Sequence, residues 1–269
     1  MSPKPAVDEA HRLDIGQRLR KLEAAEGVRI VLAVESGSRA WGFASPDSDY
    51  DVRFVYVRPR AHYLSIRVED RRDVIERPIV DEIDLNGWDL RKALRLLART
   101  NPAVIEWLQS PITYVEGGSF RAQALALLPA LYSGVRGLHH YRHTAASNHR
   151  AYLRGERVRL KKYLYVLRPL LAARWIEARG TPPPMAFAAL LAATDLPPDF
   201  CEAVADLLAR KQAAGEMADG PPMPALQRFI EAELERSALA PSVPEDLAAD
   251  AAWEALDRLF VDVLGEDSA

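Results

Sequence analysis

The pattern of hydrophobic and polar positions in the first part of the chain predicts a small sheet. Residues 28–34 and 52–57 are apolar runs with the length and β-branched composition of buried strands. Shorter runs at 74–75 and 79–89, with turn residues between them, predict a third and a fourth strand. Residues 7–26 precede these strands and carry apolar side chains at helical spacing, which predicts an amphipathic helix.

Helical periodicity dominates from residue 89 onward. Asp89 is suited to cap a helix that repeats leucines, and Pro102 is suited to the first turn of the next one. Strand signals nearly vanish after about residue 116, and six further segments have helical spacing. Proline-rich breaks separate some of them, at residues 181–184 and 220–224.

These elements predict the α+β class, with two domains along the chain. Residues 1–115 are expected to form a small mixed sheet flanked by helices, and residues 116–269 an all-helical domain. A chain of 269 residues, 49% hydrophobic and 27% charged, has the composition of an ordinary globular protein.

Composition also narrows the expected compartment. Cys201 is the single cysteine, so an intramolecular disulfide and a multi-cysteine zinc site are both excluded. The N-terminal residues lack the apolar segment of a signal peptide, and no later segment is long and apolar enough to span a membrane. We therefore expect a cytoplasmic protein without a membrane partner.

The net charge of −3 conceals an uneven distribution. Residues 134–179 contain eleven Lys or Arg and two acids, whereas residues 195–269 contain seventeen acids and five bases. Such an excess of basic residues is typical of a segment that lies near a bound polyanion. Two solvated helical faces of opposite sign would give the same counts, so charge alone leaves both interpretations open.

Three aspartates are the strongest candidates for chemistry. Side chains alternate along a strand, so Asp49, Asp51 and Arg53 are expected on one face. Two neighbouring carboxylates repel each other unless a cation lies between them, and a hard divalent ion is the usual one. Asp84, in the fourth predicted strand, can join the pair if the two strands are neighbours. Three carboxylates can hold two magnesium ions for phosphoryl or nucleotidyl transfer.

A glycine–serine turn lies just before these aspartates. Gly37 permits a tight turn and the close approach of a ligand, and Ser38 with the following amides can bind phosphate. Taken separately, a Gly-Ser turn, an Asp-x-Asp pair and Asp84 are each more often structural than catalytic. Their order and their places on successive elements favour catalysis.

The stretch GSRAWGFASPDSDYDVRFVYV resembles the signature of the polymerase-beta nucleotidyltransferase superfamily. With DLNGWDLRKALRLL and KKYLYVLRPLLAARWI downstream, it is similar to the RNA-repair-associated, RlaP-like branch. The resemblance covers roughly residues 30–180. It implies transfer of a nucleoside monophosphate from an NTP such as ATP to a hydroxyl, with release of pyrophosphate and with two Mg²⁺ ions bound.

The resemblance also implies roles for individual residues. Gly37 and Ser38 would hold phosphates, Asp49 and Asp51 would bind both metal ions, and Asp84 would bind the catalytic metal ion and help activate the acceptor hydroxyl. Arg39 and Arg53 are further candidate nucleotide contacts. Arg53 alternatively neutralises the aspartates whose face it shares.

A second group of candidates lies on the basic helix. Lys161, Tyr165 and Arg168 follow one helical stripe, in which cations can meet phosphates and the ring can stack on a base. Pro169 is expected to kink this helix. The alternative is that the ring belongs to the core and the cations extend to the surface.

The leading hypothesis is therefore a magnesium-dependent nucleotidyltransferase that acts on an RNA end. The expected partners are an NTP, an RNA acceptor and RNA-repair proteins. Two alternatives remain: nucleotidyl transfer to a protein side chain or a small molecule, and a nucleotide-binding or RNA-binding module without turnover.

Overall fold

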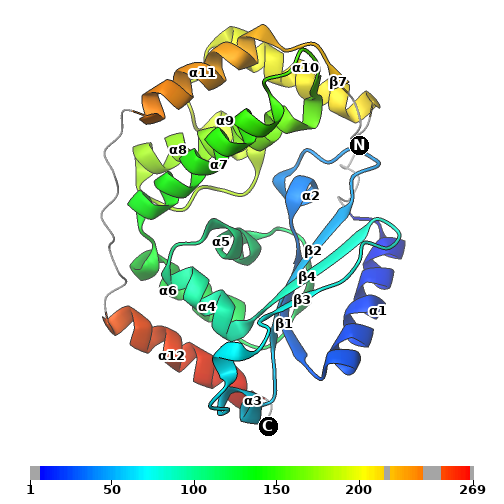
Figure 1. The fold of residues 1–269 in the computed structure, drawn as a ribbon, viewed down its shortest axis with the longest axis vertical. Helices are drawn as coiled ribbons and strands as arrows, with labels where there is room; N and C mark the ends of the chain where they lie inside the picture. The colour runs from blue at the N-terminus through cyan, green and yellow to red at the C-terminus, as the bar shows by residue number, and fades with distance from the viewer. Residues whose placement is uncertain (1–6, 215–218, 239–249, 267–269) are drawn as a thin grey trace. The chain divides into compact units, whose positions relative to one another are not determined.

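Five strands form one mixed sheet in the order β3-β4-β2-β1-β5 (Figure 1). The structure is a computed structural model that describes residues 7–214, 219–238 and 250–266. Strand β2 runs parallel to β4, and the other neighbouring strands are antiparallel. The strands are β1 (Arg29–Glu35), β2 (Tyr50–Val57), β3 (Val74–Glu76), β4 (Ile83–Asp89) and β5 (Thr113–Glu116).

The four predicted strands are confirmed, and β5 was not predicted. It pairs with β1 at the edge of the sheet and has only four residues, so its local pattern is weak. The sheet near the N-terminus and the helices that follow it confirm the predicted α+β class.

Helices cover both faces of the sheet (Figure 1). One face packs against α1 (Glu9–Glu26) through a core that includes Ile15, Leu19 and Phe54. The other face packs against a core to which four helices contribute. These helices are α4 (Leu90–Ala98), α5 (Pro102–Gln109), α6 (Phe120–Leu131) and α12 (Asp250–Gly265).

Helix starts follow the sequence signals closely. The Asp89 side chain accepts a hydrogen bond from the Arg91 amide and begins α4 directly after β4. Asn101 caps α5 in the same way, ahead of Pro102 in the first turn. Short helical segments occupy the loops: α2 (Gly37–Trp41), α3 (Arg60–Tyr63) and the 3₁₀ helix η1 (Val68–Asp70).

The chain divides into two compact units, and their boundary differs from the expected one at residue 115. The first unit contains residues 1–40, 49–132 and 247–269, and the second contains 41–48 and 133–246. The difference has a clear physical cause. The buried faces of α6 and α12 complete the hydrophobic core above the sheet, so both helices belong with the sheet despite following the expected boundary.

The second unit is helical. Its helices are α7 (Gly134–Tyr152), α8 (Leu160–Arg179), α9 (Phe187–Ala192), α10 (Pro198–Ala214) and α11 (Pro224–Ala238), and a two-stranded sheet joins β6 (Val158–Arg159) to β7 (Asp219–Gly220).

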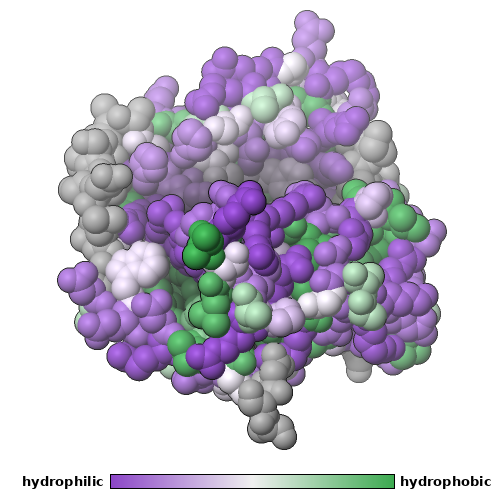
Figure 2. Space-filling view, turned by 60° about the horizontal axis from the view of Figure 1, so that its bottom comes forward, coloured by the Kyte–Doolittle hydropathy of each residue, from purple (hydrophilic) through white to green (hydrophobic). Residues whose placement is uncertain are grey.

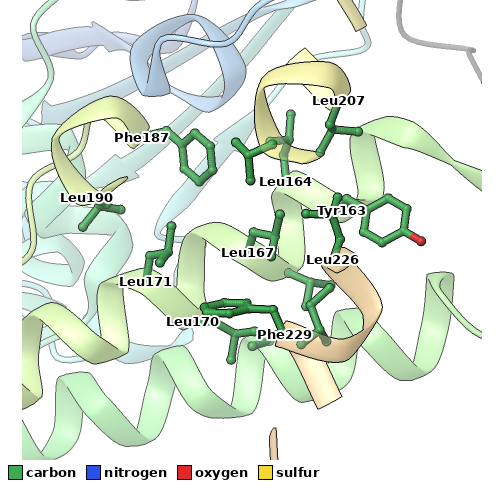
Figure 3. Close-up of a cluster of buried hydrophobic side chains, with 14 of the residues drawn as sticks. Tyr163, Leu164, Leu167, Leu170, Leu171, Phe187, Leu190, Leu207, Leu226 and Phe229 are labelled. Atoms are coloured by element: carbon green, nitrogen blue, oxygen red, sulfur yellow. The ribbon is translucent and has the colours of Figure 1, made fainter. Parts of the chain in front are cut away.

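Helix α8 is central to the second unit. Figure 3 shows Leu164, Leu167 and Leu171 on it, directed toward apolar side chains from α9, α10 and α11. Pro169 lies inside α8, which continues through it as one element. None of the described helices combines the length and the apolar character required to cross a lipid bilayer.

Candidate functional site

Asp51 and Asp84 lie opposite each other on neighbouring strands. β2 and β4 pair in parallel with Asp51 in register with Asp84, which confirms that the two predicted strands are neighbours. Tyr50 and Val52, on either side of Asp51, point into the α1 side of the sheet, so the carboxylate points to the other side. The two carboxylates therefore share one face near the start of both strands.

Arg53 connects these two carboxylates. Its Nη2 atom donates to Asp51 Oδ1 at 2.9 Å and to Asp84 Oδ2 at 2.7 Å. Its Nη1 atom donates to the backbone oxygen of Asp84 at 3.1 Å. All three side chains are partly exposed, at 19–30% of their area. One guanidinium thus offsets the repulsion between two carboxylates that the strand register holds side by side.

Position 37 requires a glycine because its backbone lies against the Asp51 side chain. Its φ of +56° is in the left-handed region, and a Cβ at this position would lie 1.9 Å from Asp51 Oδ2. The Ser36 amide donates to the Asp51 carbonyl oxygen at 2.8 Å. The glycine–serine turn and the carboxylate pair are therefore parts of one structure, and the space above Gly37 is what admits the Asp51 carboxylate.

Glu35 is the residue of this site that sequence reasoning missed. Its side chain is fully buried, and it accepts hydrogen bonds from the Asp51 amide at 2.9 Å and from the Tyr114 hydroxyl. Burial raises the pKa of Glu35 to about 7, although both hydrogen bonds oppose the rise. In the sequence it stands between a strand and a Gly-Ser turn, where a carboxylate is usually solvated. Its hydrogen-bond donor Tyr114 lies on the unpredicted strand β5.

The remaining predicted residues of the first unit lie around this centre. Asp49 directly precedes β2 and is exposed, and its backbone oxygen accepts from Arg39 Nε at 3.2 Å. The Arg39 guanidinium lies over the Tyr50 ring, 3.9 Å from its centroid. Ser38 is buried at 6% exposure.

The three predicted carboxylates do not form a ready-made metal cluster. Within the described ranges, no three His, Cys, Asp or Glu side chains are grouped so that they could hold a metal ion. The physical reason is visible in the arrangement: Asp49 faces solvent, and Arg53 lies between the other two carboxylates.

Asp51 and Asp84 nevertheless fit a magnesium ion in their chemistry. They supply hard oxygen ligands that converge on one cationic group, which is the environment that a divalent ion prefers. Gly37 lies against the Asp51 carboxylate and, because it has no Cβ, leaves the room that this carboxylate occupies.

The candidate residues on the basic helix lie in the second unit. Arg168 is 4% exposed, and its Nε and Nη2 atoms both donate to the Met185 carbonyl oxygen at 3.3 Å. Its guanidinium also lies over the Trp41 ring. Tyr165 and Lys161 are half-buried on the same helix. These contacts give Arg168 a structural role within its own unit, and the nucleotide-binding role of all three residues stays a prediction.

Comparison with known proteins identifies the family. The family model described as the RNA repair pathway DNA polymerase beta family, RlaP, matches residues 12–262. A Bacillus subtilis (strain 168) protein, uncharacterized YcgL, is 46% identical over 218 residues, which cover 81% of this chain and 83% of that protein.

Among solved structures, a nucleotidyltransferase-like protein from Exiguobacterium sibiricum 255-15 is 12% identical with a TM-score of 0.30, and the match covers 93% of this chain and 88% of that one. The family model spans nearly all of the described residues, including the glycine–serine turn and the aspartates. The chain therefore belongs to the RNA repair pathway DNA polymerase beta family, which is of the nucleotidyltransferase type.

Proposed function

We propose that this protein transfers a nucleoside monophosphate from an NTP to a hydroxyl group, with an RNA end as the acceptor. The observation that carries the proposal is the Asp51–Arg53–Asp84 cluster beside Gly37. In the reaction, the acceptor oxygen forms a bond to the α-phosphorus and loses its proton. The bond from the α-phosphorus to the bridging oxygen breaks, and pyrophosphate leaves.

The carboxylates are suited to this chemistry because they need a cation. Asp51 and Asp84 would hold magnesium, with Asp49 as a further ligand next to the start of β2. Bound magnesium offsets the charge of the phosphates and favours loss of the proton from the acceptor hydroxyl.

Arg53 has a defined part in this proposal. Without metal ions, it supplies the charge that keeps the carboxylates together. With magnesium held by the two carboxylates, the Arg53 guanidinium would be available to contact a phosphate of the NTP. The two predicted roles of Arg53 are thus successive, and they use the same atoms.

The test is a transfer assay with the purified full chain. Protein, magnesium and each α-labelled NTP are incubated with single-stranded RNA, and labelled RNA and pyrophosphate are measured. Asp51→Asn and Asp84→Asn should each reduce the rate at least about 100-fold, which corresponds to about 3 kcal/mol in the barrier.

Asp81→Asn is the matched control, because Asp81 is exposed and lies three residues before Asp84. Its left-handed φ of 52° is one that asparagine tolerates. Label that migrates with protein or with a small molecule would assign another acceptor. Equal rates for wild type and Asp51→Asn over all acceptors would refute the transferase proposal.

A further inference from the structure

A cavity at the other end of the first unit is independent of the carboxylate site. It has a volume of about 280 Å³ and lies between α4 and α12. Asp84 is near the start of β4, and α4 begins directly after the end of that strand. Five residues of extended strand separate the two ends by roughly 17 Å. The lining residues are Arg91, Leu94, Arg95, Trp253, Leu256, Asp257 and Phe260.

One side of this cavity is apolar and aromatic. Leu94 and Leu256 are buried and form part of the core above the sheet. Trp253 and Phe260 pack against that core but keep part of their surface open to the cavity. Figure 2, which looks toward this end of the unit, shows hydrophobic side chains recessed among hydrophilic ones. A volume near the lower end of known ligand pockets and two partly open rings suit one planar ring system.

The other side of the cavity is basic. Arg91 and Arg95 also line an adjoining polar pocket, to which Arg71, Arg72 and Lys92 contribute. This pocket has five Lys or Arg side chains against three acids, Glu69, Asp73 and Asp89. Asp89 is buried and already caps α4. The two pockets meet at Arg91 and Arg95, so a ring in one can be joined to an anion in the other.

We propose that these adjoining pockets bind one nucleotide unit, with its base between α4 and α12 and its phosphate on Arg91 and Arg95. Stacking on aromatic rings and bidentate contact with guanidinium groups are the interactions that recognise these two parts. The unit can be a free nucleotide or one residue of an RNA strand. The proposal does not rest on the transfer reaction, because the cavity is distant from the carboxylates and binding can be measured without magnesium.

Glu69 provides a specific prediction for this site. It pairs with both arginines, with Arg91 Nη2 and with Arg95 Nη1 at 3.4 Å. Its own side chain is 65% exposed on the short η1 helix, and the two arginines lower its pKa. A phosphate that binds both guanidinium groups must displace this carboxylate. Glu69 therefore acts as an internal competitor of the ligand.

The experiment measures binding of a short fluorescent single-stranded RNA to the full chain by anisotropy, in EDTA and at low salt. Trp253→Leu and Arg95→Ala should each weaken binding at least about 5-fold, as expected for loss of stacking on one base or of one phosphate contact. Glu69→Gln should tighten binding several-fold, because it removes the competitor. Arg20→Ala is the control, since Arg20 is exposed on α1, which covers the opposite face of the sheet.

Competition with AMP distinguishes the two sources of the ligand. Release of the RNA by millimolar AMP, on the order of the weak affinity of one nucleotide, identifies a mononucleotide site. Resistance to AMP, together with dependence on Trp253 and Arg95, identifies a site for an RNA strand.

Equal losses in Arg95→Ala and Arg20→Ala would overturn the proposal, because they would show a general effect of charge. Unchanged affinity in Glu69→Gln would also overturn it, and this surface variant does not depend on repacking of the core. Loss of transfer activity in Asp51→Asn with intact RNA binding would leave this site standing, so the two proposals can fail separately.

Discussion

Replacement of Glu35 by Gln should remove a pH dependence of stability that the carboxylate site creates. Glu35 is fully buried, and its pKa rises from 4.5 to about 7 because burial disfavours the charged form. The folded protein therefore keeps a proton on Glu35 at pH values where the unfolded chain has lost it. As pH rises from about 4.5 to about 7, this group lowers the stability of the folded state.

The size of the effect follows from the pKa difference. One pKa unit corresponds to about 1.4 kcal/mol, so a rise from 4.5 to about 7 corresponds to roughly 3 kcal/mol. At pH values below the pKa of Glu35 in the unfolded chain, this destabilisation of the folded state is absent. At pH values above the pKa of Glu35 in the folded protein, it is fully present. The glutamine side chain does not ionise, so the Glu35→Gln variant should gain up to roughly 3 kcal/mol relative to wild type between about pH 5 and about pH 8.

Urea unfolding of both proteins in EDTA, repeated across this pH range, measures the difference in free energy of unfolding. Other titrating groups, such as His62 and Asp89, are common to both proteins and cancel in the difference. Glu116→Gln, on an exposed residue of the neighbouring strand β5, should give a flat difference. A flat difference for Glu35→Gln as well would refute the reasoning. It would show that the hydrogen bonds from Tyr114 and Asp51 keep the carboxylate ionised.

Three other substitutions test particular contacts. Gly37→Ala should abolish transfer as fully as Asp51→Asn, because the alanine Cβ would collide with the Asp51 carboxylate. Gly27→Ala is the control: Gly27 has a similar φ of +61° and no neighbour within 4 Å of an added Cβ, so this variant should lose only about 1 kcal/mol of stability and retain activity. Leu259→Ala in α12 should lower the free energy of unfolding, measured in urea, by about 2–5 kcal/mol, whereas Val261→Ala, at an exposed position of the same helix, should lower it by less than about 0.5 kcal/mol. Equal losses would mean that α12 does not belong to the core above the sheet. Arg168→Lys should destabilise the second unit by about 1–3 kcal/mol, because lysine cannot reproduce the two hydrogen bonds from the guanidinium to the Met185 carbonyl oxygen. Unchanged stability together with lost NTP binding would instead make Arg168 a ligand contact.

The elements that the sequence predicted well are those with strong local signals. The apolar runs of β1 and β2, the Asp89 cap and Pro102 each determine their element with little help from distant residues. Strand β5 has only four residues and forms by pairing with the edge of β1, so its local sequence pattern does not predict it. The helix α12 was predicted as a helix, but which surface a helix packs against depends on the rest of the core.

The candidate site shows the same division between local and distant causes. Strand alternation placed Asp51 and Arg53 on one face, and the parallel pairing of β2 with β4 then brought Asp84 beside them. Alternation also put Asp49 on that face, but Asp49 directly precedes the first residue of β2 that pairs with β4, and it is exposed. Position on a face is a local property, whereas convergence requires a strand on each side.

Glu35 and Gly37 explain why the glycine–serine turn and the aspartates occur together in the chain. The end of β1 and the turn that follows it supply an acceptor for the Asp51 amide, a donor for the Asp51 carbonyl oxygen and a space for the Asp51 carboxylate. Each of the three contacts comes from a different residue, in the order Glu35, Ser36, Gly37. A shift of β2 by one residue against β1 would break all of them and turn Asp51 to the opposite face. The turn thus fixes the register that brings Asp51 into line with Asp84, in addition to any contact that it makes with a phosphate.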